Sequence, residues 1–284
     1  MPISATPITA GLAHQSAGNA EFVVAELGGE GSGEENRRVT AEEDGHRHGL
    51  AAVAIFVVNA PGLPRQHDEA GLVLAGDLLA VSAVGIMKQH IRPGDMVVPD
   101  QLFDRTKGIR PSTFFGDGVA GHVSLADPFC GDLRRPLAEA ARSCGATVHE
   151  GGTYVCMDGP QFSTRAESHF YRDAVDASVI GMTAIPEAKL AREAEMCYAI
   201  LAMGTDYDCW HETEEDVSVD TVVATMKANA GVANRVVQMV AGLLPLMSDC
   251  ACLSAARLAT ITDSEAITSE AKARLRLLYG KYWD

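Results

Sequence analysis

Short apolar runs alternate with amphipathic segments from residue 78 onward, and this alternation constrains the fold more than any other feature. The runs Leu78–Val84 and Tyr198–Met203 are apolar without a polar face, which is typical of strands buried on both sides. One helix is predicted by apolar residues at helical spacing, with Gly145 as its stop: Leu133, Leu137, Ala140, Ala141 and Cys144. Strands that alternate with helices indicate an α/β fold around one central sheet.

Local signals predict the remaining elements of this region. Three further strands are expected, at Met96–Val98, Thr153–Met157 and Val179–Met182. Helices are expected to begin at the capping box Thr164–Glu167, at Pro186 (running to about Met196), at the Ser218 cap and after Thr262. No linker interrupts residues 78 to 284, which we interpret as a single domain.

Residues 1 to 77 differ in composition, since they contain no Lys, Tyr, Trp or Cys and are rich in Gly, Ala and Glu. Two short apolar runs stand out, Phe22–Val24 and Ala52–Val58. The rest has poor periodicity and is interpreted as loop or weakly specified structure. We therefore place a boundary near residue 77.

Composition excludes several classes of protein. A net charge of −15 argues against nucleic acid and anionic membranes as partners. No apolar run approaches the ~18 residues of a spanning helix, and no signal peptide is recognised. Seven cysteines at irregular spacing predict a reduced, cytoplasmic protein. The pair Cys250 and Cys252 suits a redox pair or half a metal site, but no other ligands are evident, so we interpret it as structural and expect no metal.

The segment Gly204–Trp210 follows the buried run and contains two carboxylates, Asp206 and Asp208. In open α/β sheets, ligands bind beyond the carboxyl ends of strands. Buried carboxylates need a partner or a function, because an unpaired buried charge is costly. The alternative is a polar turn in which Asp206 caps the next element. Ser82-Ala83 and Met182-Thr183 are also interpreted as turns that follow strands, so the three segments predict one pocket along one sheet edge.

Four ordered motifs in this region resemble those of the 5′-methylthioadenosine phosphorylases. The motifs are Gly159–Ser168 (GPQFSTRAES), Gly181–Glu187 (GMTAIPE), Thr205–Trp210 (TDYDCW), and Arg92–Asp95 (RPGD) with Asp100–Thr106 (DQLFDRT). The resemblance covers about residues 78 to 284. It implies a single-domain phosphorylase-like fold with a central mixed sheet flanked by helices. It also implies a cytoplasmic homotrimer that acts on a nucleoside and inorganic phosphate, without a metal or organic cofactor.

The resemblance implies a role for each matching residue. Ser82, Ala83 and Thr183 would bind phosphate, and Asp206 would protonate N7 of the base. Other residues would bind the nucleoside: Phe162, Ser163, Met182, Tyr207, Asp208, with His122 from a neighbouring subunit. The pocket for the 5′-methylthio group would be lined by Val219, Val222 and Val223. A water-poor pocket would raise the pKa of Asp206, and Asp208 would select the 6-amino group of adenine.

Each role has a simpler alternative. Ser82 could only terminate a strand, and Thr183 could only cap the helix at Pro186. The three valines would be core in most proteins, and His122 could be a surface residue. Other functions that stay open are phosphorolysis of adenosine or methylthioinosine, or purine binding by a catalytically impaired protein.

The first 77 residues depart from the family. The glycine-rich phosphate loop and the Pro-Arg-His-Gly segment of the family are not found. Gly28–Gly33 is only weakly similar to the loop, and Leu63–His67 is only weakly similar to the Arg-His segment. Either this part is divergent or replaced, or a shifted reading frame has been joined to a genuine downstream sequence. In both cases we expect part of the phosphate site to be missing and the sheet to lack an edge strand.

Overall fold

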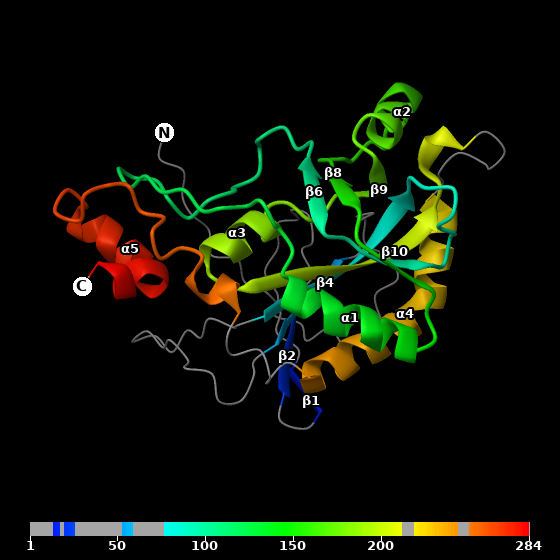
Figure 1. The fold of residues 1–284 in the computed structure, drawn as a ribbon, viewed down its shortest axis with the longest axis horizontal. Helices are drawn as coiled ribbons and strands as arrows, with labels where there is room; N and C mark the ends of the chain where they lie inside the picture. The colour runs from blue at the N-terminus through cyan, green and yellow to red at the C-terminus, as the bar shows by residue number, and fades with distance from the viewer. Residues whose placement is uncertain are drawn as a thin grey trace, which may run out of the picture.

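Figure 1 shows the computed structural model, which describes residues 14–17, 20–25, 53–58, 77–211, 219–243 and 250–283. Before residue 77 only the backbone of the strands is described, as also for residues 219–223, 226–228, 242 and 243 of one helix. Ten strands of the described part form one mixed sheet, so the predicted α/β fold is confirmed.

Two long strands, β4 (Asp77–Ile86) and β10 (Cys197–Asp206), form the parallel centre of the sheet. On one side of them, β5 (Met96–Val98) pairs antiparallel with β10, and β7 (Val148–Glu150) pairs parallel with β5. A second branch leaves the end of β4 in the order β9 (Ala177–Gly181), β8 (Thr153–Cys156) and β6 (Gln101–Asp104). The sequence prediction missed β6 and β7, because strands of three or four residues carry little periodicity.

The other edge of β4 is covered by β3 (Val53–Val58), followed by β2 (Ala20–Ala25) and β1 (His14–Ala17), all antiparallel. The expectation that the sheet lacks this edge strand is therefore wrong: the backbone of β3 pairs with β4 from Val53–Ser82 to Val58–Asp77. Both apolar runs predicted in this region are strands. The two segments that are weakly similar to family motifs, Gly28–Gly33 and Leu63–His67, lie outside the described residues.

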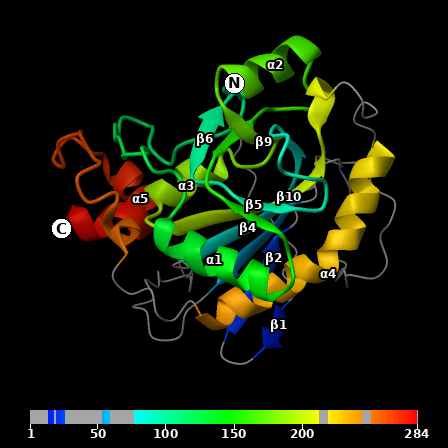
Figure 2. The same ribbon diagram turned by 45° about the vertical axis from the view of Figure 1, so that its right-hand side comes forward.

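Helices cover both faces of the central strands (Figures 1 and 2). One face holds α1 (Gly131–Ser143) and α4 (Val219–Leu243), which also contact each other. The opposite face holds α3 (Glu187–Glu193), while α2 (Arg165–Asp173) packs near β9. The last helix, α5 (Ser269–Tyr279), lies at one end of the molecule.

The side chains of β4 and β10 alternate between two cores, as the period of two in a strand requires. Leu79, Val81, Ala199 and Leu201 belong to the core beneath α1 and α4. Their neighbours Ala80, Val84, Ile200 and Ala202 belong to the core beside α3. Because both faces are buried, these strands read as continuous apolar runs. Fully burying a Leu or Val side chain contributes about 1.5–3 kcal/mol, so the buried side chains of β4 and β10 contribute strongly to the stability of the fold.

The predicted helix signals are largely confirmed. Thr164 Oγ1 accepts from the Glu167 amide over 3.3 Å, and Glu167 Oε2 accepts from the Thr164 amide over 2.9 Å, so the capping box opens α2. Gly145 follows α1 with a φ of +91°, as a stop signal requires. Pro186 is the N-cap of α3, which ends at Glu193, three residues earlier than expected. Ser218 lies outside the described residues.

Four cysteines that are distant in the sequence meet in the core beneath α1 and α4. Their Sγ atoms all lie within 4.8 Å of one another, and all four side chains are buried: Cys130, Cys197, Cys250 and Cys252. The expectation that no other possible ligands lie near Cys250 and Cys252 is therefore wrong, because Cys130 and Cys197 lie beside them. It failed because Cys130 precedes α1 and Cys197 begins β10, so only the tertiary structure brings them together.

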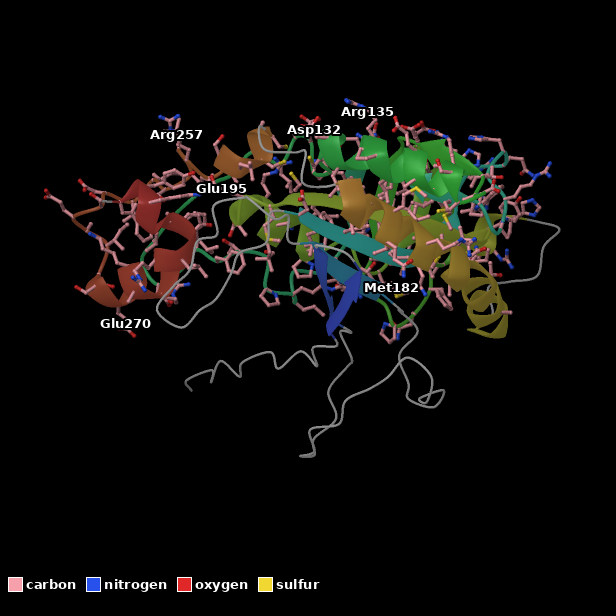
Figure 3. All side chains as sticks on the ribbon, turned by 90° about the horizontal axis from the view of Figure 1, so that it is seen from below. Asp132, Arg135, Met182, Glu195, Arg257 and Glu270 are labelled. Atoms are coloured by element: carbon pink, nitrogen blue, oxygen red, sulfur yellow. The ribbon has the colours of Figure 1, made fainter. Side chains whose placement is uncertain are left out.

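The C-terminal segment packs as a separate small core around α5, with Val119 from a preceding loop. Glu195 joins it to the main body, since its Oε1 accepts from the Ala256 amide at 2.9 Å and from the Tyr282 hydroxyl at 2.6 Å. Figure 3 shows Glu195 between α5 and the sheet. Within the described ranges, none of the helices combines the length and the apolarity needed to cross a membrane.

Candidate active site

A pocket lies where β4 and β10 end, beside the ends of β8 and β9. Its wall consists of main chain and side chains from these strand ends and the following loops: Ala83, Val84, Gly85, Met157, Phe162, Ser163, Ile180, Gly181, Met182, Thr183, Thr205, Asp206 and Asp208. In Figure 3, Met182 lies on the side of the sheet opposite Asp132 and Arg135 of α1. The pocket therefore occupies the predicted edge, at the carboxyl ends of the two central parallel strands.

Asp206 is the last residue of β10 and is held by two hydrogen bonds. Its Oδ1 accepts from the Asp208 amide at 2.9 Å, and its Oδ2 accepts from the Thr205 hydroxyl at 2.6 Å. Burial raises the pKa of Asp206, and these two hydrogen bonds oppose the shift. Because each carboxyl oxygen has two lone pairs, both retain capacity toward the pocket. The arrangement suits a carboxylic acid that keeps its proton at a higher pH than usual.

Asp208 begins a short 3₁₀ turn, η1 (Asp208–Trp210), with a positive φ of +50°. Its Oδ2 accepts from the Ser168 hydroxyl of α2 at 2.6 Å, and both side chains are buried. Burial raises the pKa of Asp208, the Ser168 hydrogen bond opposes this, and the charge of Asp206 adds to it. Two neighbouring carboxyl groups, the half-buried Asp206 and the buried Asp208, thus line one pocket.

A pair of hydroxyls, of which Thr183 lines the pocket, forms a second polar group of the site. Ser82 Oγ and Thr183 Oγ1 lie 2.9 Å apart, although 101 positions separate them in the sequence. The Tyr154 hydroxyl lies 3.3 Å from Thr183 Oγ1 and completes a chain of three hydroxyls. Ala83 and Thr183 line the pocket directly, whereas Ser82 is 1% exposed and reaches it through Thr183. Such a cluster of donors can bind an anion's oxygen atoms.

The side chains of Phe162, Ser163 and Met182 also line the pocket. Phe162 is 38% exposed, which leaves part of its ring available to a planar ligand. The Ser163 hydroxyl points toward Met157 Sδ at 3.8 Å. Met182 lies against Gly159, where an added Cβ would come within 2.6 Å of the Met182 sulfur.

Arg110 fixes the main chain beneath the pocket. Its guanidinium donates to the Met182 carbonyl at 2.7 Å, to the Asp158 carbonyl at 3.0 Å, and to the carbonyl of Ile185. Its Nε also pairs with the Asp158 carboxylate at 3.1 Å. One side chain thus joins the loop after β8 to the loop after β9. Sequence reasoning missed this role, because an arginine that binds distant carbonyls leaves no local pattern.

Two predicted site residues, Tyr207 and His122, do not line this pocket, and three others have side chains outside the described residues. The Tyr207 ring does not line it and instead stacks on His211, with ring centroids 4.6 Å apart. His122 is exposed and lines a different depression with Lys189 and Glu193. The predicted residues Val219, Val222 and Val223 belong to the first turns of α4, but their side chains lie outside the described residues. The roles of these five residues stay predictions.

Two polar residues of the site have no predicted role in the sequence. Ser168 is 0% exposed and supports Asp208, while Thr205 is 2% exposed and supports Asp206. A signal existed for each: Ser168 lies one helical turn after the Thr164 cap, and Thr205 interrupts an otherwise apolar strand. A buried hydroxyl needs a partner, which in both cases is a carboxylate.

The comparisons with known proteins agree on one family. The sequence profile of the phosphorylase superfamily matches residues 46–241. A protein named S-methyl-5′-thioadenosine phosphorylase from Geobacter sulfurreducens is 54% identical over 205 residues, which are 72% of this chain and 71% of that protein. One of the same name from Koribacter versatilis is 48% identical over 206 residues, 72% of this chain and 70% of that protein.

Solved structures of methylthioadenosine phosphorylases also resemble this chain. A methylthioadenosine phosphorylase from an antarctic soil metagenomic library superposes with a TM-score of 0.67 at 45% identity, covering 72% of both chains. Methylthioadenosine phosphorylase from Schistosoma mansoni, solved in complex with adenine, gives a TM-score of 0.57 at 30% identity and also covers 72% of both chains.

Proposed function

The chain belongs to the phosphorylase superfamily, and on this premise we propose that it cleaves 5′-methylthioadenosine with inorganic phosphate. The products are adenine and 5-methylthioribose 1-phosphate. One observation carries the proposal: the half-buried Asp206 and the buried Asp208 share a pocket with Thr183, whose hydroxyl lies 2.9 Å from that of Ser82. The first pair suits a purine, and the second suits an anion.

Asp206 acts as the general acid. The bond between C1′ of the sugar and N9 of the base breaks, and its electrons move into the purine. The anionic base is a poor leaving group, so Asp206 donates a proton to N7 as the bond breaks. Burial raises the pKa of Asp206, which keeps this proton available near neutral pH. Phosphate oxygen then bonds to C1′. Over the whole reaction the phosphate hydroxyl supplies the proton that adenine retains.

Asp208 gives the base specificity. Its carboxylate accepts from the 6-amino group of adenine, and the Ser168 hydroxyl holds it in place at 2.6 Å. A 6-oxopurine has no donor at this position, and an unpaired buried polar group costs about 1–3 kcal/mol. Phe162 stacks on the purine, Ser163 lies in the base pocket, and Met182 packs on the ribose.

Phosphate is bound by Thr183, by Ser82 through the hydroxyl chain, and by the main chain at Ala83. The sugar passes through an oxocarbenium-like state, as in glycoside cleavage, so a nearby anion stabilises it. The reaction uses phosphate as a co-substrate and needs neither a metal nor an organic cofactor.

Assembly and location extend the proposal. The chain works in the cytoplasm as a homotrimer, in which His122 completes a neighbour's pocket. His122 is exposed and is not among the residues that line the pocket of its own chain, which supports this. The 5′-methylthio group binds at Val219, Val222 and Val223, with Tyr207 behind the base.

The test is adenine release from 5′-methylthioadenosine, with and without phosphate. We expect release only with phosphate, slower turnover of adenosine, and least turnover of methylthioinosine. Asp208→Asn should reduce the preference for the 6-amino substrate, whereas the exposed Asp173→Asn should behave as the unaltered protein. Folded protein that binds adenine without any phosphate-dependent release would refute the proposal and leave a purine-binding function.

A further inference from the structure

The four-cysteine cluster lies outside the pocket and takes no part in the proposed reaction. Its members come from three separate segments: Cys130 is the N-cap of α1, Cys197 begins β10, and Cys250 and Cys252 flank the start of η3 (Ala251–Ser254). We propose that these four thiols bind one zinc ion as a structural site that joins the three segments.

The spacing of the sulfur atoms fits a tetrahedral site. Four thiolates at about 2.3 Å from zinc lie about 3.8 Å from one another. In the protein, all four Sγ atoms lie within 4.8 Å of one another, and the Cys130 and Cys250 sulfurs are 3.4 Å apart. Adjustments of a few tenths of an ångström to one ångström therefore complete the tetrahedron. Soft thiolate ligands in this geometry select zinc over magnesium or calcium.

Hydrogen-bond donors around the cluster suit a group that carries negative charge. Arg192 Nη1 donates to Cys252 Sγ at 3.5 Å, and the Cys252 amide donates to Cys250 Sγ at 3.5 Å. Cys130 stands at the N-terminus of α1, a helix of 13 residues, where the helix dipole favours negative charge. Zinc with four thiolates carries a net charge of −2, and the Arg192 guanidinium offsets part of it.

Simple packing explains the cluster less well. Buried cysteines often behave as small apolar side chains. Ala or Val would fill the same space, however, without drawing a guanidinium to its border. A second hydrogen bond fixes the Arg192 side chain beside the cluster, since its Nη2 donates to the Asp127 carbonyl. A fixed cation beside four convergent thiols is the arrangement expected of a metal site.

The position of the site makes its role structural. Cys197 is the first residue of β10 and Asp206 is the last, so the cluster and the pocket lie at opposite ends of a strand of about 30 Å. All four protein ligands are present, as in closed structural zinc sites, with none left for a reacting water. Binding releases the thiol protons to solvent and holds the segment from Cys250 onward against β10 and α1.

The direct test is the metal content of the full chain. The protein is expressed with zinc in the medium and purified without chelators or a metal-binding tag. Its zinc content is then measured by elemental mass spectrometry. We expect about one zinc per chain. A strong chelator should remove it and lower the melting temperature, and added Zn²⁺ should restore both. Replacement by Co²⁺ should give the intense charge-transfer absorption of cobalt bound to thiolates.

Matched variants assign the ligands. Cys250→Ser should reduce bound zinc severalfold, whereas Cys144→Ser, which lies at the end of α1 outside the cluster, should not. Thiols are also counted with a chromogenic disulfide reagent after denaturation, with and without reductant. Native protein without zinc and with all seven thiols free would overturn the proposal in favour of packing. Loss of thiols that reductant restores would overturn it in favour of a disulfide.

Discussion

The Ser168 hydroxyl donates to Asp208 Oδ2 over 2.6 Å, and this buried hydrogen bond links α2 to a carboxyl group that lines the pocket. A hydrogen bond to a charged group contributes about 1.5–3 kcal/mol. In Ser168→Ala, Asp208 loses this donor, so we expect adenine to bind about tenfold more weakly. Calorimetry with adenine measures this. The exposed Ser124→Ala serves as the control, and equal affinity of the two variants would contradict the role of Ser168.

The proton on Asp206 predicts a pH dependence. Because burial raises the pKa of Asp206, the acid form exists below that raised value and disappears as the pH rises through it. The rate should therefore be flat at lower pH and fall above the pKa. In Asp206→Asn the rate should no longer fall at higher pH, and kcat should be lower by about 10²–10⁴-fold. Steady-state rates between pH 5 and pH 9 test this, and Asp173→Asn should keep the fall in rate at higher pH.

Thr183 stands between Ser82 and Tyr154 in the chain of hydroxyls. Thr183→Val keeps the shape of the side chain but removes the hydroxyl, leaving its two partners with one fewer hydrogen bond. We expect the KM for phosphate to rise about tenfold, with a smaller change in the KM for the nucleoside. Phosphate titrations at saturating nucleoside measure this. An unchanged KM for phosphate, matching the exposed Thr147→Val, would remove Thr183 from the phosphate site.

Gly159 and Gly108 form a matched pair for testing Met182. Both have a positive φ, +71° and +74°, so Ala at either position costs about 1–2 kcal/mol of backbone strain. Only at Gly159 would the new Cβ meet a neighbour, the Met182 sulfur at 2.6 Å; at Gly108 nothing lies within 4 Å. We expect Gly159→Ala to lower kcat/KM severalfold and Gly108→Ala to leave it nearly unchanged. Similar losses in both variants would show that strain alone is responsible.

Glu187, at the start of α3, predicts a pH dependence of stability. Burial raises its pKa from 4.5 to about 7, while its own amide and Arg110 oppose the shift. Because the folded pKa is the higher one, this contribution to stability is fully present below pH 4.5 and is lost as the pH rises through 7. Glu187→Gln should flatten the decline in melting temperature between pH 5 and pH 8. The exposed Glu139→Gln should retain it.

The main elements of the fold follow from local sequence. Strands β4 and β10 are buried on both faces, so their apolar runs reveal them without any partner. The Thr164–Glu167 capping box and Gly145 mark helix ends because their hydrogen bonds and backbone angles are set within a few residues. The candidate pocket was located for a similar reason, since Asp206 ends a buried strand and Asp208 follows it closely.

Only the tertiary structure decided which distant side chains meet. The parallel register of β4 and β10 places Ser82 beside Ala202, and the return of β9 then brings Thr183 to Ser82. The same folding brings Cys130 and Cys197 to the Cys250–Cys252 pair. Hydrogen bonds and metal sites act over about 3–5 Å, whereas these partners lie 53 to 122 positions apart in sequence. Sheet order and helix packing set such contacts, and no local pattern records them.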